Sequence, residues 1–354
     1  MTNSVTTLLA RWRQATAPEA IFPDLATMSL TTLKQQYHQL AVTVHPDRHP
    51  SCPDAPEAFR LLQQWYGIAQ QQVAQRVNGA VPLVVTTAKA RYVSTDGPLS
   101  GDLCDLYPAA ADQQAVLLKV VRSPHNNDLL QREAQVLQRL ARTLDGQAVR
   151  AHFPTLIEPL QLRDVAGVQR HVNVLAYEAA YISLAEIIRL QPAGVDAADA
   201  AWMFNRILAA LGVIHQLDLV HGAVTPDHVL IRLHDHNGLL LDWCYSVPSG
   251  EPLKAMNLAY RTDYPPEVAA RQPATAATDL YMAACCMVRL LGGDPATGVV
   301  PKRVPKAIQR LLRGCLLPAP HRRANDAWEL FAEFHAVLGH LYGPPRFRPF
   351  HLPV

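Results

Sequence analysis

Charge is scarce in this sequence, and clusters of basic residues are scarcer still. Asp, Glu, Lys and Arg make up 18% of its 354 residues, and the formal net charge is +2. Lys and Arg form short doublets such as Arg322–Arg323, which suit a solvated surface. Because nucleic-acid-binding domains usually present a basic face, we expect no nucleic acid among the partners.

Cysteine is also sparse, and its spacing excludes the common zinc motifs. The six cysteines include no CxxC pair, so we expect no structural metal. Cys285 and Cys286 lie in an apolar helical run, which indicates core positions. Free thiols of this kind are typical of a reducing compartment, and they indicate a cytoplasmic protein.

Long uninterrupted apolar runs are missing too. The longest ones are broken by Arg206 or Arg289, which leaves them too short to span a membrane. The N-terminus lacks the basic start and long apolar stretch of a signal peptide. We therefore expect no membrane partner.

What the sequence does contain begins with two amphipathic helices. In the first, which Pro46 ends because a proline disfavours helix just before it, apolar residues recur at three- and four-residue steps. They are Leu30, Leu33, Tyr37, Leu40 and Val44. A second helix is predicted from about Pro56 to Val77, with Phe59, Leu62, Tyr66, Ala69 and Val73 on one face. The polar loop between them predicts an antiparallel helical hairpin.

That loop holds His45-Pro46-Asp47, and in this position the tripeptide resembles the J domain of DnaJ-type co-chaperones, over about residues 20 to 77. The resemblance implies docking to a DnaK-type chaperone and stimulation of its ATP hydrolysis through these three residues. The preceding helix is usually basic, but here it offers mainly Lys34 for electrostatic steering. The family's first short helix is poorly defined around residues 20 to 25. The alternative is that the tripeptide merely turns the chain.

A different architecture follows residues 78 to 82, where Gly and Pro indicate a linker. Strand-like segments come first, and they include "AVLLKVV" with Lys119. A helix carrying Glu133 follows, and from about residue 199 the chain is mostly helical. Strands with one helix, then many helices, indicate a two-lobed α+β module.

The motifs of this module follow one another in a specific order. Lys119 and Glu133 are followed by "HGAVTPDHVLI", "LLLDWC", "YPPE" and "DLYMAACCMVRLL". This order resembles the signatures of the protein-kinase fold from about residue 90 to 340. The resemblance implies an N lobe over about 83–178 and a C lobe over about 179–340. The whole chain then comprises a J domain (1–80), a kinase-like domain (81–340) and a Pro- and aromatic-rich tail (341–354).

The resemblance implies a role for each motif residue that survives. Lys119 stands where kinases hold the nucleotide phosphates, Glu133 where its ion-pair partner lies, and Asp242 where the magnesium-binding Asp lies. Gly101 is the one glycine left in the phosphate-covering loop. These residues leave ATP and Mg²⁺ open as ligands. The alternative is that Lys119 and Glu133 form a structural salt bridge that needs no nucleotide.

The catalytic loop has lost its chemistry. His221 matches a largely structural histidine, whereas Ala223 replaces the catalytic Asp, Thr225 replaces a lysine and His228 replaces a metal-holding Asn. Loss of one general base costs about 10²–10⁴ in rate, and the other losses compound it. The module therefore resembles a pseudokinase.

Other positions weaken nucleotide binding or could replace the lost groups. Leu117 stands where a small residue normally faces the adenine. Asp227 is a carboxylate near Ala223 whose direction the sequence leaves open. His221, His228, His234 and His236 lie close in sequence, but their spacing matches no metal cage, and "HDHNG" favours a turn between two strands.

Structural correspondences support the same fold. Glu267 resembles the glutamate that pairs with a late arginine, here Arg323. Asp279 resembles the buried aspartate that anchors the catalytic-loop backbone. The Pro- and aromatic-rich tail could pack on the C lobe or be bound by a partner, and packing is favoured because Phe347 and Phe350 would otherwise be exposed.

Three functions are consistent with this sequence. The first is a co-chaperone or adapter whose J domain recruits a DnaK-type chaperone and whose pseudokinase module binds an unknown protein client. The second is a divergent ATP-dependent kinase or nucleotide transferase, supported by Lys119, Glu133 and Asp242. The third is an interaction scaffold in which both modules are inert.

Overall fold

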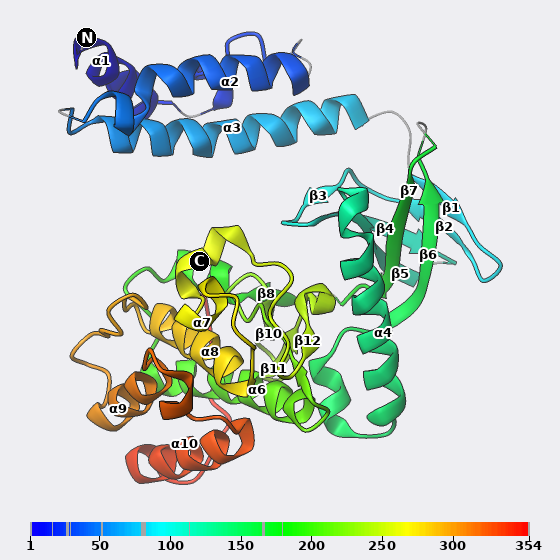
Figure 1. Cartoon of the computed structure of the whole chain (residues 1–354), viewed down its shortest axis with the longest axis vertical. Coiled ribbons are helices and arrows are strands. Elements are labelled where there is room, and N and C mark those ends of the chain that lie inside the picture. Colours follow the sequence, from blue (N-terminus) through cyan, green and yellow to red (C-terminus); the bar gives the residue numbers. More distant parts are fainter. Residues whose placement is uncertain are drawn as a thin grey trace. The chain divides into compact units, whose positions relative to one another are not determined.

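A computed structural model describes residues 2–15, 17–25, 28, 30–50, 52–78, 83–112, 114–164, 167–178 and 180–352. The chain forms two compact units, one of residues 1–100 and 106–115 and the other of residues 101–105 and 116–354 (Figure 1). In the expected linker, Asn78 ends a helix, and residues 79–82 lie outside the described part.

The first unit contains the predicted helical hairpin. Helix α2 (Leu30–Val44) and helix α3 (Ala55–Asn78) pack against each other and run antiparallel in Figure 1. Their apolar stripes meet, with Leu33, Val44, Leu62, Ala69 and Val73 all buried. Tyr37 stacks on Tyr66 at a ring distance of 4.0 Å. The hairpin prediction is confirmed.

An N-terminal helix was not predicted. Helix α1 (Thr2–Arg13) packs on α3, because Val5, Leu9 and Trp12 fall on one helical face and are buried. Arg13 clamps Glu57 with two charge-assisted hydrogen bonds of 2.5 and 3.0 Å. The segment around residues 20–25 adds the buried residues Ile21, Phe22 and Leu25 to this core.

The first unit also contains four strands. The last of them starts in the second unit, to which its first two residues belong. They are β1 (Val84–Thr86), β2 (Arg91–Ser94), β3 (Leu99–Ser100) and β4 (Cys104–Ala111). Strands β1, β2 and β4 lie antiparallel in that order, and β3 pairs with β4. Val85 and Tyr92 point to the buried face.

In the second unit, a helix crosses an antiparallel sheet. Strands β5 (Gln114–Val121), β7 (Gln169–Ala176) and β6 (Leu156–Arg163) follow in that order, and Lys119 lies opposite Asn173. Helix α4 (Asn127–Thr143) lies against β6 and β7 (Figure 1). Its apolar positions recur at helical spacing, so it buries Leu130, Leu137 and the carboxylate of Glu133 on the sheet side.

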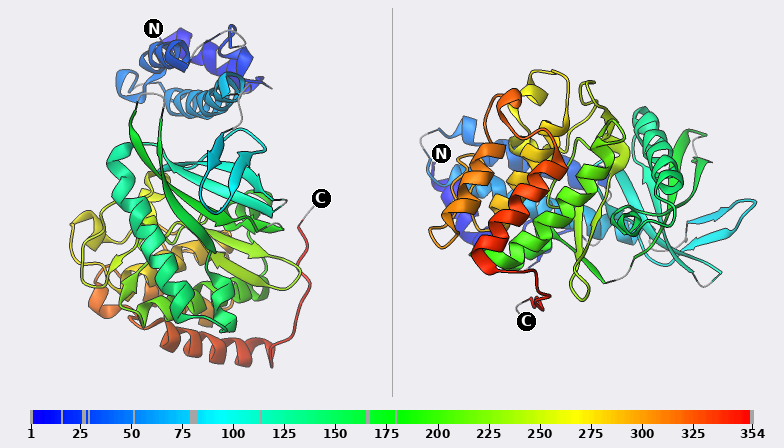
Figure 2. Two further views of the ribbon diagram at one scale, coloured as in Figure 1. Left: turned by 90° about the vertical axis from the view of Figure 1, so that its right-hand side faces the viewer. Right: turned by 90° about the horizontal axis from the view of Figure 1, so that it is seen from below.

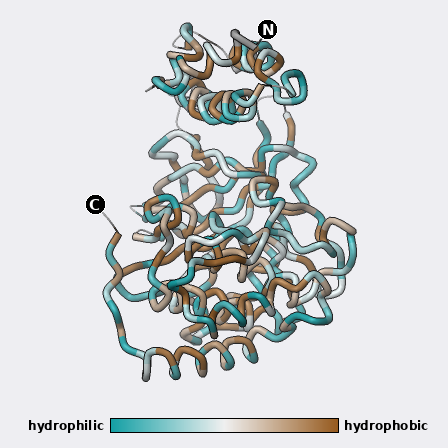
Figure 3. The backbone as a smooth tube through the Cα atoms, turned by 90° about the vertical axis from the view of Figure 1, so that its left-hand side faces the viewer, coloured by the Kyte–Doolittle hydropathy of each residue, from teal (hydrophilic) through white to brown (hydrophobic). Residues whose placement is uncertain are grey.

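The rest of the second unit is mainly helical. Its helices are α5 (Leu184–Leu190), α6 (Ala197–His215), α7 (Pro266–Ala269), α8 (Ala276–Leu290), α9 (Lys306–Cys315) and α10 (Ala327–Tyr342). Its short strands are β8 (Tyr181–Ser183), β9 (Leu219–Val220), β10 (Val229–Arg232), β11 (Asn237–Leu240) and β12 (Val247–Pro248). Hydrophobic segments gather in the interior of this unit, as Figure 3 shows. The predicted two-lobed α+β order is confirmed.

Helix α6 is the central helix of this core. By length and composition alone it could cross a membrane, but 72% of its most apolar window is buried inside the protein. Arg206 breaks its apolar surface and donates to the carbonyl oxygen of His236 at 2.6 Å. The features of α6 are therefore those of a core helix that packs on α8 and α10.

Two smaller predictions have different outcomes. Strands β10 and β11 pair across the turn that contains His236, whose φ is 57°, as the sequence predicts. In the tail, which runs back from α10 (Figure 2), Phe350 is buried but Phe347 is 61% exposed. The ring of Phe347 packs against His236, with 4.4 Å between ring centres, but most of it stays exposed, so only Phe350 is buried as expected.

Candidate functional site

The first candidate site is the loop between α2 and α3. Pro46–Arg48 form a single 3₁₀ turn whose N-cap is His45. Nδ1 of His45 accepts a hydrogen bond from the backbone N–H of Asp47 at 3.2 Å. The imidazole also packs edge-on against Phe59 of α3, with 4.9 Å between ring centres. The loop is therefore held by its own histidine and by the second helix.

This fixed loop exposes polar groups. The side chain of Asp47 is 91% exposed, whereas that of His45 is 40% exposed. Lys34 is exposed on α2. A fixed turn that presents one carboxylate and one imidazole loses little conformational entropy when a partner binds it.

The second candidate site surrounds Lys119 of β5. Its ammonium group donates to Glu133 Oε1 of α4 at 2.7 Å and to Asp242 Oδ1, which follows β11. The side chains of Lys119 and Glu133 are only 5% and 2% exposed. Asn173 of β7 donates to the second oxygen of Glu133 at 2.9 Å. The structure thus brings the sequence-predicted Lys119, Glu133 and Asp242 together.

Buried charges at this site hold one another ionised. Burial disfavours a charged Asp242, yet the adjacent Lys119 ammonium more than offsets this and lowers the pKa of the Asp242 carboxyl. Burial likewise disfavours a charged lysine, but the carboxylate of Asp242 holds the pKa of Lys119 well above its ordinary value. With two carboxylates around one ammonium, such a cluster can hold a further cation or serve as a structural ion pair.

The backbone of the predicted catalytic loop keeps a specific shape. Asp279 of α8 accepts hydrogen bonds from the backbone N–H groups of His221 and Gly222 at 2.7 and 2.8 Å. The imidazole of His221 bonds the carbonyl of Leu241 at 2.8 Å and packs edge-on against Trp243. Burial lowers the pKa of His221 to about 4. This histidine is therefore a neutral structural group.

In the predicted catalytic loop, positions 223 and 225 carry no acid or base. Ala223 is fully buried in an apolar cluster. Thr225 is also buried, and its hydroxyl finds no hydrogen-bond partner among the described residues. Asp227, the nearest carboxylate in sequence, is exposed and bonds the hydroxyl of Tyr260. None of these three side chains reaches the Lys119 cluster.

His228 does reach this cluster, together with a carboxylate that the sequence analysis missed. Its Nε2 lies 3.1 Å from Asp242 Oδ2 and 3.7 Å from Asp102 Oδ2. Tyr245 donates its hydroxyl hydrogen to Asp102. The sequence signal for Asp102 was its place beside Gly101 in the phosphate-covering loop, but no local pattern points this turn toward His228.

The turn that carries Asp102 is tightly folded. Gly101 donates its N–H to the carbonyl of Cys104 at 2.9 Å. A Cβ on Gly101 would lie 2.9 Å from that same oxygen, so glycine fits best. Arg122 donates to the carbonyl of Gly101 at 2.6 Å and to Asp105 at 3.2 Å.

Leu117, the residue expected beside the adenine position, packs against the core of the second unit.

The remaining predicted correspondence is a buried ion pair. Arg323 makes two hydrogen bonds to Glu267, of 2.7 and 2.8 Å, and the two side chains are 0% and 2% exposed. Burial opposes the charge of Glu267, but hydrogen bonds from Arg323 lower its pKa overall. This pair ties α7 to the turn before α10.

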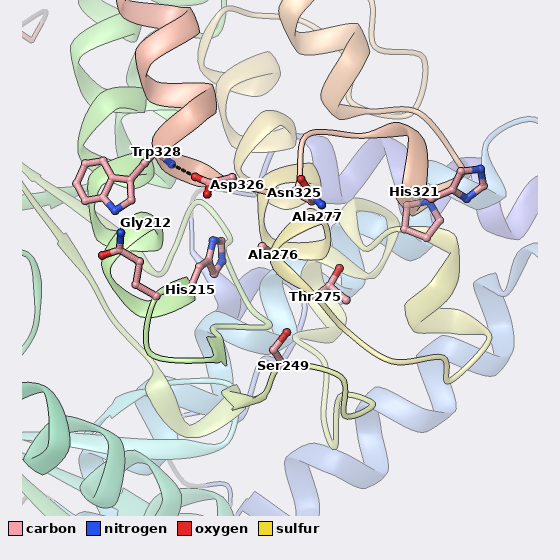
Figure 4. A pocket seen from close by; sticks show the side chains of 12 residues that line it. Gly212, His215, Ser249, Thr275, Ala276, Ala277, His321, Asn325, Asp326 and Trp328 are labelled. Atoms are coloured by element: carbon pink, nitrogen blue, oxygen red, sulfur yellow. Dashed lines mark hydrogen bonds between the residues drawn. The ribbon is translucent and has the colours of Figure 1, made fainter.

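The second unit also contains a cavity of about 620 Å³ that no sequence pattern indicated. Figure 4 shows Gly212, His215, Thr275 and Trp328 in its wall. Nε2 of His215 lies 3.1 Å from Asp279, and Nδ1 has no hydrogen-bond partner within the described part of the chain. His215 in the cavity wall thus contacts Asp279, the side chain that holds the backbone of the predicted catalytic loop.

Comparison with known proteins gives one sequence match and a structural likeness. The sequence model described as the DnaJ domain matches residues 25–76. No curated protein matches the chain. Among many matching solved structures is a crystal structure of the BubR1 kinase domain. It aligns with a TM-score of 0.57 and 13% identity over 73% of this chain and 84% of that one.

At this level of identity, the second likeness shows the fold alone. The chain therefore carries a DnaJ domain, followed by a protein-kinase-like fold. A DnaJ domain implies, in general, a chaperone partner of the Hsp70 or DnaK type.

Proposed function

We propose that this protein is a cytoplasmic co-chaperone whose J domain recruits and stimulates a DnaK-type chaperone, while its kinase-like module is a pseudokinase that binds a protein client. The observation that carries this proposal is a contrast between two loops. The His45–Asp47 loop is fixed and exposed, whereas the loop around Ala223 is buried and apolar.

Support for chaperone recruitment comes from the order of the first loop. Phe59 and the N–H of Asp47 restrain the imidazole of His45, so a partner meets this ring in one orientation beside the exposed Asp47 carboxylate. Charge-assisted hydrogen bonds to an exposed carboxylate are stronger than neutral ones. The sparsely charged α2 suggests that affinity depends on these contacts more than on electrostatic steering.

Support for the pseudokinase comes from the chemistry at residues 223–228. Phosphoryl transfer needs a group that orients or deprotonates the acceptor hydroxyl and a positive charge on the transferred phosphoryl group. Ala223 supplies no proton acceptor, Thr225 supplies no charge, and Asp227 faces Tyr260. The fold remains, and with it a surface that can bind a client.

Chaperone stimulation tests the first half of the proposal. The full chain should raise the single-turnover ATP hydrolysis rate of its cognate DnaK-type chaperone, and Asp47→Asn should return that rate to the basal value. Asp96→Asn is the matched control, because Asp96 is an exposed carboxylate outside the loop. Equal stimulation by wild type and Asp47→Asn contradicts chaperone recruitment through this loop.

The alternative of a divergent kinase or nucleotide transferase rests on Lys119, Glu133 and Asp242. Calorimetric titration with ATP, with and without Mg²⁺, tests the nucleotide site, and Lys119→Met of verified fold is the control. Incubation with labelled ATP and a broad substrate mixture tests transfer. Label transfer that Asp242→Asn abolishes would establish the alternative and overturn the pseudokinase.

A further inference from the structure

Three side chains from three separate segments converge beside the Lys119 cluster. They are Asp102 from the turn before β4, His228 from the loop before β10, and Asp242, which follows β11. One ligand atom of each lies within 4.8 Å of those of the other two. We call these three residues the Asp–His–Asp cluster.

A backbone carbonyl fixes the orientation of the His228 imidazole. Nδ1 of His228 lies 2.9 Å from the carbonyl oxygen of Ala223, and the residue is 4% exposed. Because a carbonyl only accepts, Nδ1 carries a hydrogen, and Nε2 faces the two carboxylates. Metal-ligating histidines show this arrangement, in which the remote nitrogen donates to a backbone carbonyl.

Nε2 and the two carboxylate oxygens repel one another unless a proton on Nε2 or a metal ion lies between them. The amide of Asn257 is the neutral neighbour of Nε2, but at 3.5 Å it is too distant for a strong hydrogen bond. In this part of the site Lys119 supplies one positive charge, against the three carboxylates of Glu133, Asp242 and Asp102. A divalent cation would balance that excess of negative charge.

The spacing of the ligand atoms fits a small ion. Two ligands bound tetrahedrally at about 2.1 Å from a metal lie about 3.4 Å apart. The distances from His228 Nε2 to Asp242 and Asp102 are 3.1 and 3.7 Å, so they bracket that value. The hydrogen bond from Tyr245 orients the Asp102 carboxylate, which is the role of an outer-shell partner.

We propose that the Asp–His–Asp cluster binds a divalent transition-metal ion, with zinc as the ion to test, and that it does so without a nucleotide. An imidazole with two carboxylates suits zinc or manganese, whereas magnesium prefers oxygen ligands throughout. A second group of potential ligands, Glu133, Asp242 and Cys244, is less suitable, because the Lys119 ammonium contacts all three side chains. The bound ion ties the turn of Asp102 to the loop of His228.

The test uses the full-length, tag-free chain after treatment with a chelator, and it measures binding by calorimetry with zinc chloride and, separately, magnesium chloride. We expect one zinc ion per chain with a Kd below micromolar, at least 100-fold weaker binding in His228→Asn, and far weaker binding of magnesium. His234→Asn is the matched control, because His234 belongs to the same β10–β11 region but its side chain is 68% exposed. It should bind like wild type.

Two further measurements keep the result interpretable. Cobalt(II) absorption distinguishes the ligands: we expect visible d–d bands without the near-ultraviolet thiolate band that binding at the buried free cysteines would give. Circular dichroism of each metal-free variant checks its fold, and Asp102→Asn replaces His228→Asn if the latter does not fold. Equal zinc binding in wild type and the folded cluster variant, a thiolate band, or no binding in wild type would overturn the proposal.

Discussion

Replacement of Lys119 by methionine should destabilise the second unit strongly, even without a nucleotide. The substitution keeps most of the side-chain volume but leaves Glu133 and Asp242 without their shared cation. At pH 7, about three pH units above the ordinary aspartate pKa, protonation of one carboxyl costs about 4 kcal/mol. This agrees with the roughly 3–5 kcal/mol lost when one partner of a buried pair is removed.

Differential scanning calorimetry of the full chain at pH 7 measures this effect. A module of this size loses about 2–4 °C in Tm for each kcal/mol, so Lys119→Met should lower the transition of the second unit by roughly 8–16 °C. Lys254→Met is the matched control, because Lys254 and Asp128 are both exposed and 3.8 Å apart. Removal of such a surface pair costs below about 1 kcal/mol.

A second substitution tests the cause. In Lys119→Met with Asp242→Asn, part of the lost stability should return, because one uncompensated charge is gone. If Lys119→Met and Lys254→Met shift the transition equally, Lys119 does not stabilise the fold as an ion-pair partner. If the Tm of Lys119→Met falls strongly, the folded fraction of this variant must be measured before a loss of ATP binding is assigned to the nucleotide site.

Three more perturbations test other parts of the structure. The pKa of His221 is lowered by burial to about 4, so the unfolded chain takes up a proton first, and stability should fall by up to about 3 kcal/mol between pH 6.5 and pH 4. The Tm profile of His221→Asn should be flatter there, and equal slopes would refute this. Glu267→Gln leaves Arg323 buried and unpaired, so urea unfolding should show a loss of about 3–5 kcal/mol; a loss below about 1 kcal/mol would contradict it. Phe59→Ala releases the ring of His45 and should reduce chaperone stimulation severalfold at unchanged helicity, whereas Phe59→Tyr should keep it; equal stimulation by both variants would show that this ring contact is dispensable.

Periodicity was sufficient to predict the elements whose apolar stripes are long. Leu33 and Leu62 each belong to a stripe of five apolar positions, and both are fully buried at the α2–α3 contact. Helix α1 carries the same kind of signal in Val5, Leu9 and Trp12, but over three positions among polar residues. Its stability comes from packing on α3 and from Arg13–Glu57, which a local pattern does not reveal.

In the candidate site, too, some contacts could be predicted from the sequence and others could not. The contact between Lys119 and Glu133 follows from the order of a strand and a helix that pack together, so motif order was enough. The contact between Asp102 and Tyr245 joins residues 143 positions apart, and it depends on the direction in which one tight turn points. Sequence proximity instead suggested His221, His228, His234 and His236, of which His228 reaches the cluster while His234 is exposed.

The buried alanine of the catalytic loop also bears on the protein's evolutionary history. Ala223 packs with Cys104, Cys244 and Tyr245, while Asp279 holds the loop backbone without help from residue 223. Reintroduction of an aspartate there would place a carboxylate in an apolar cluster, at a cost of several kcal/mol. Under the proposed pseudokinase function, a return to aspartate would therefore require these neighbours to change first, so no single substitution would restore it.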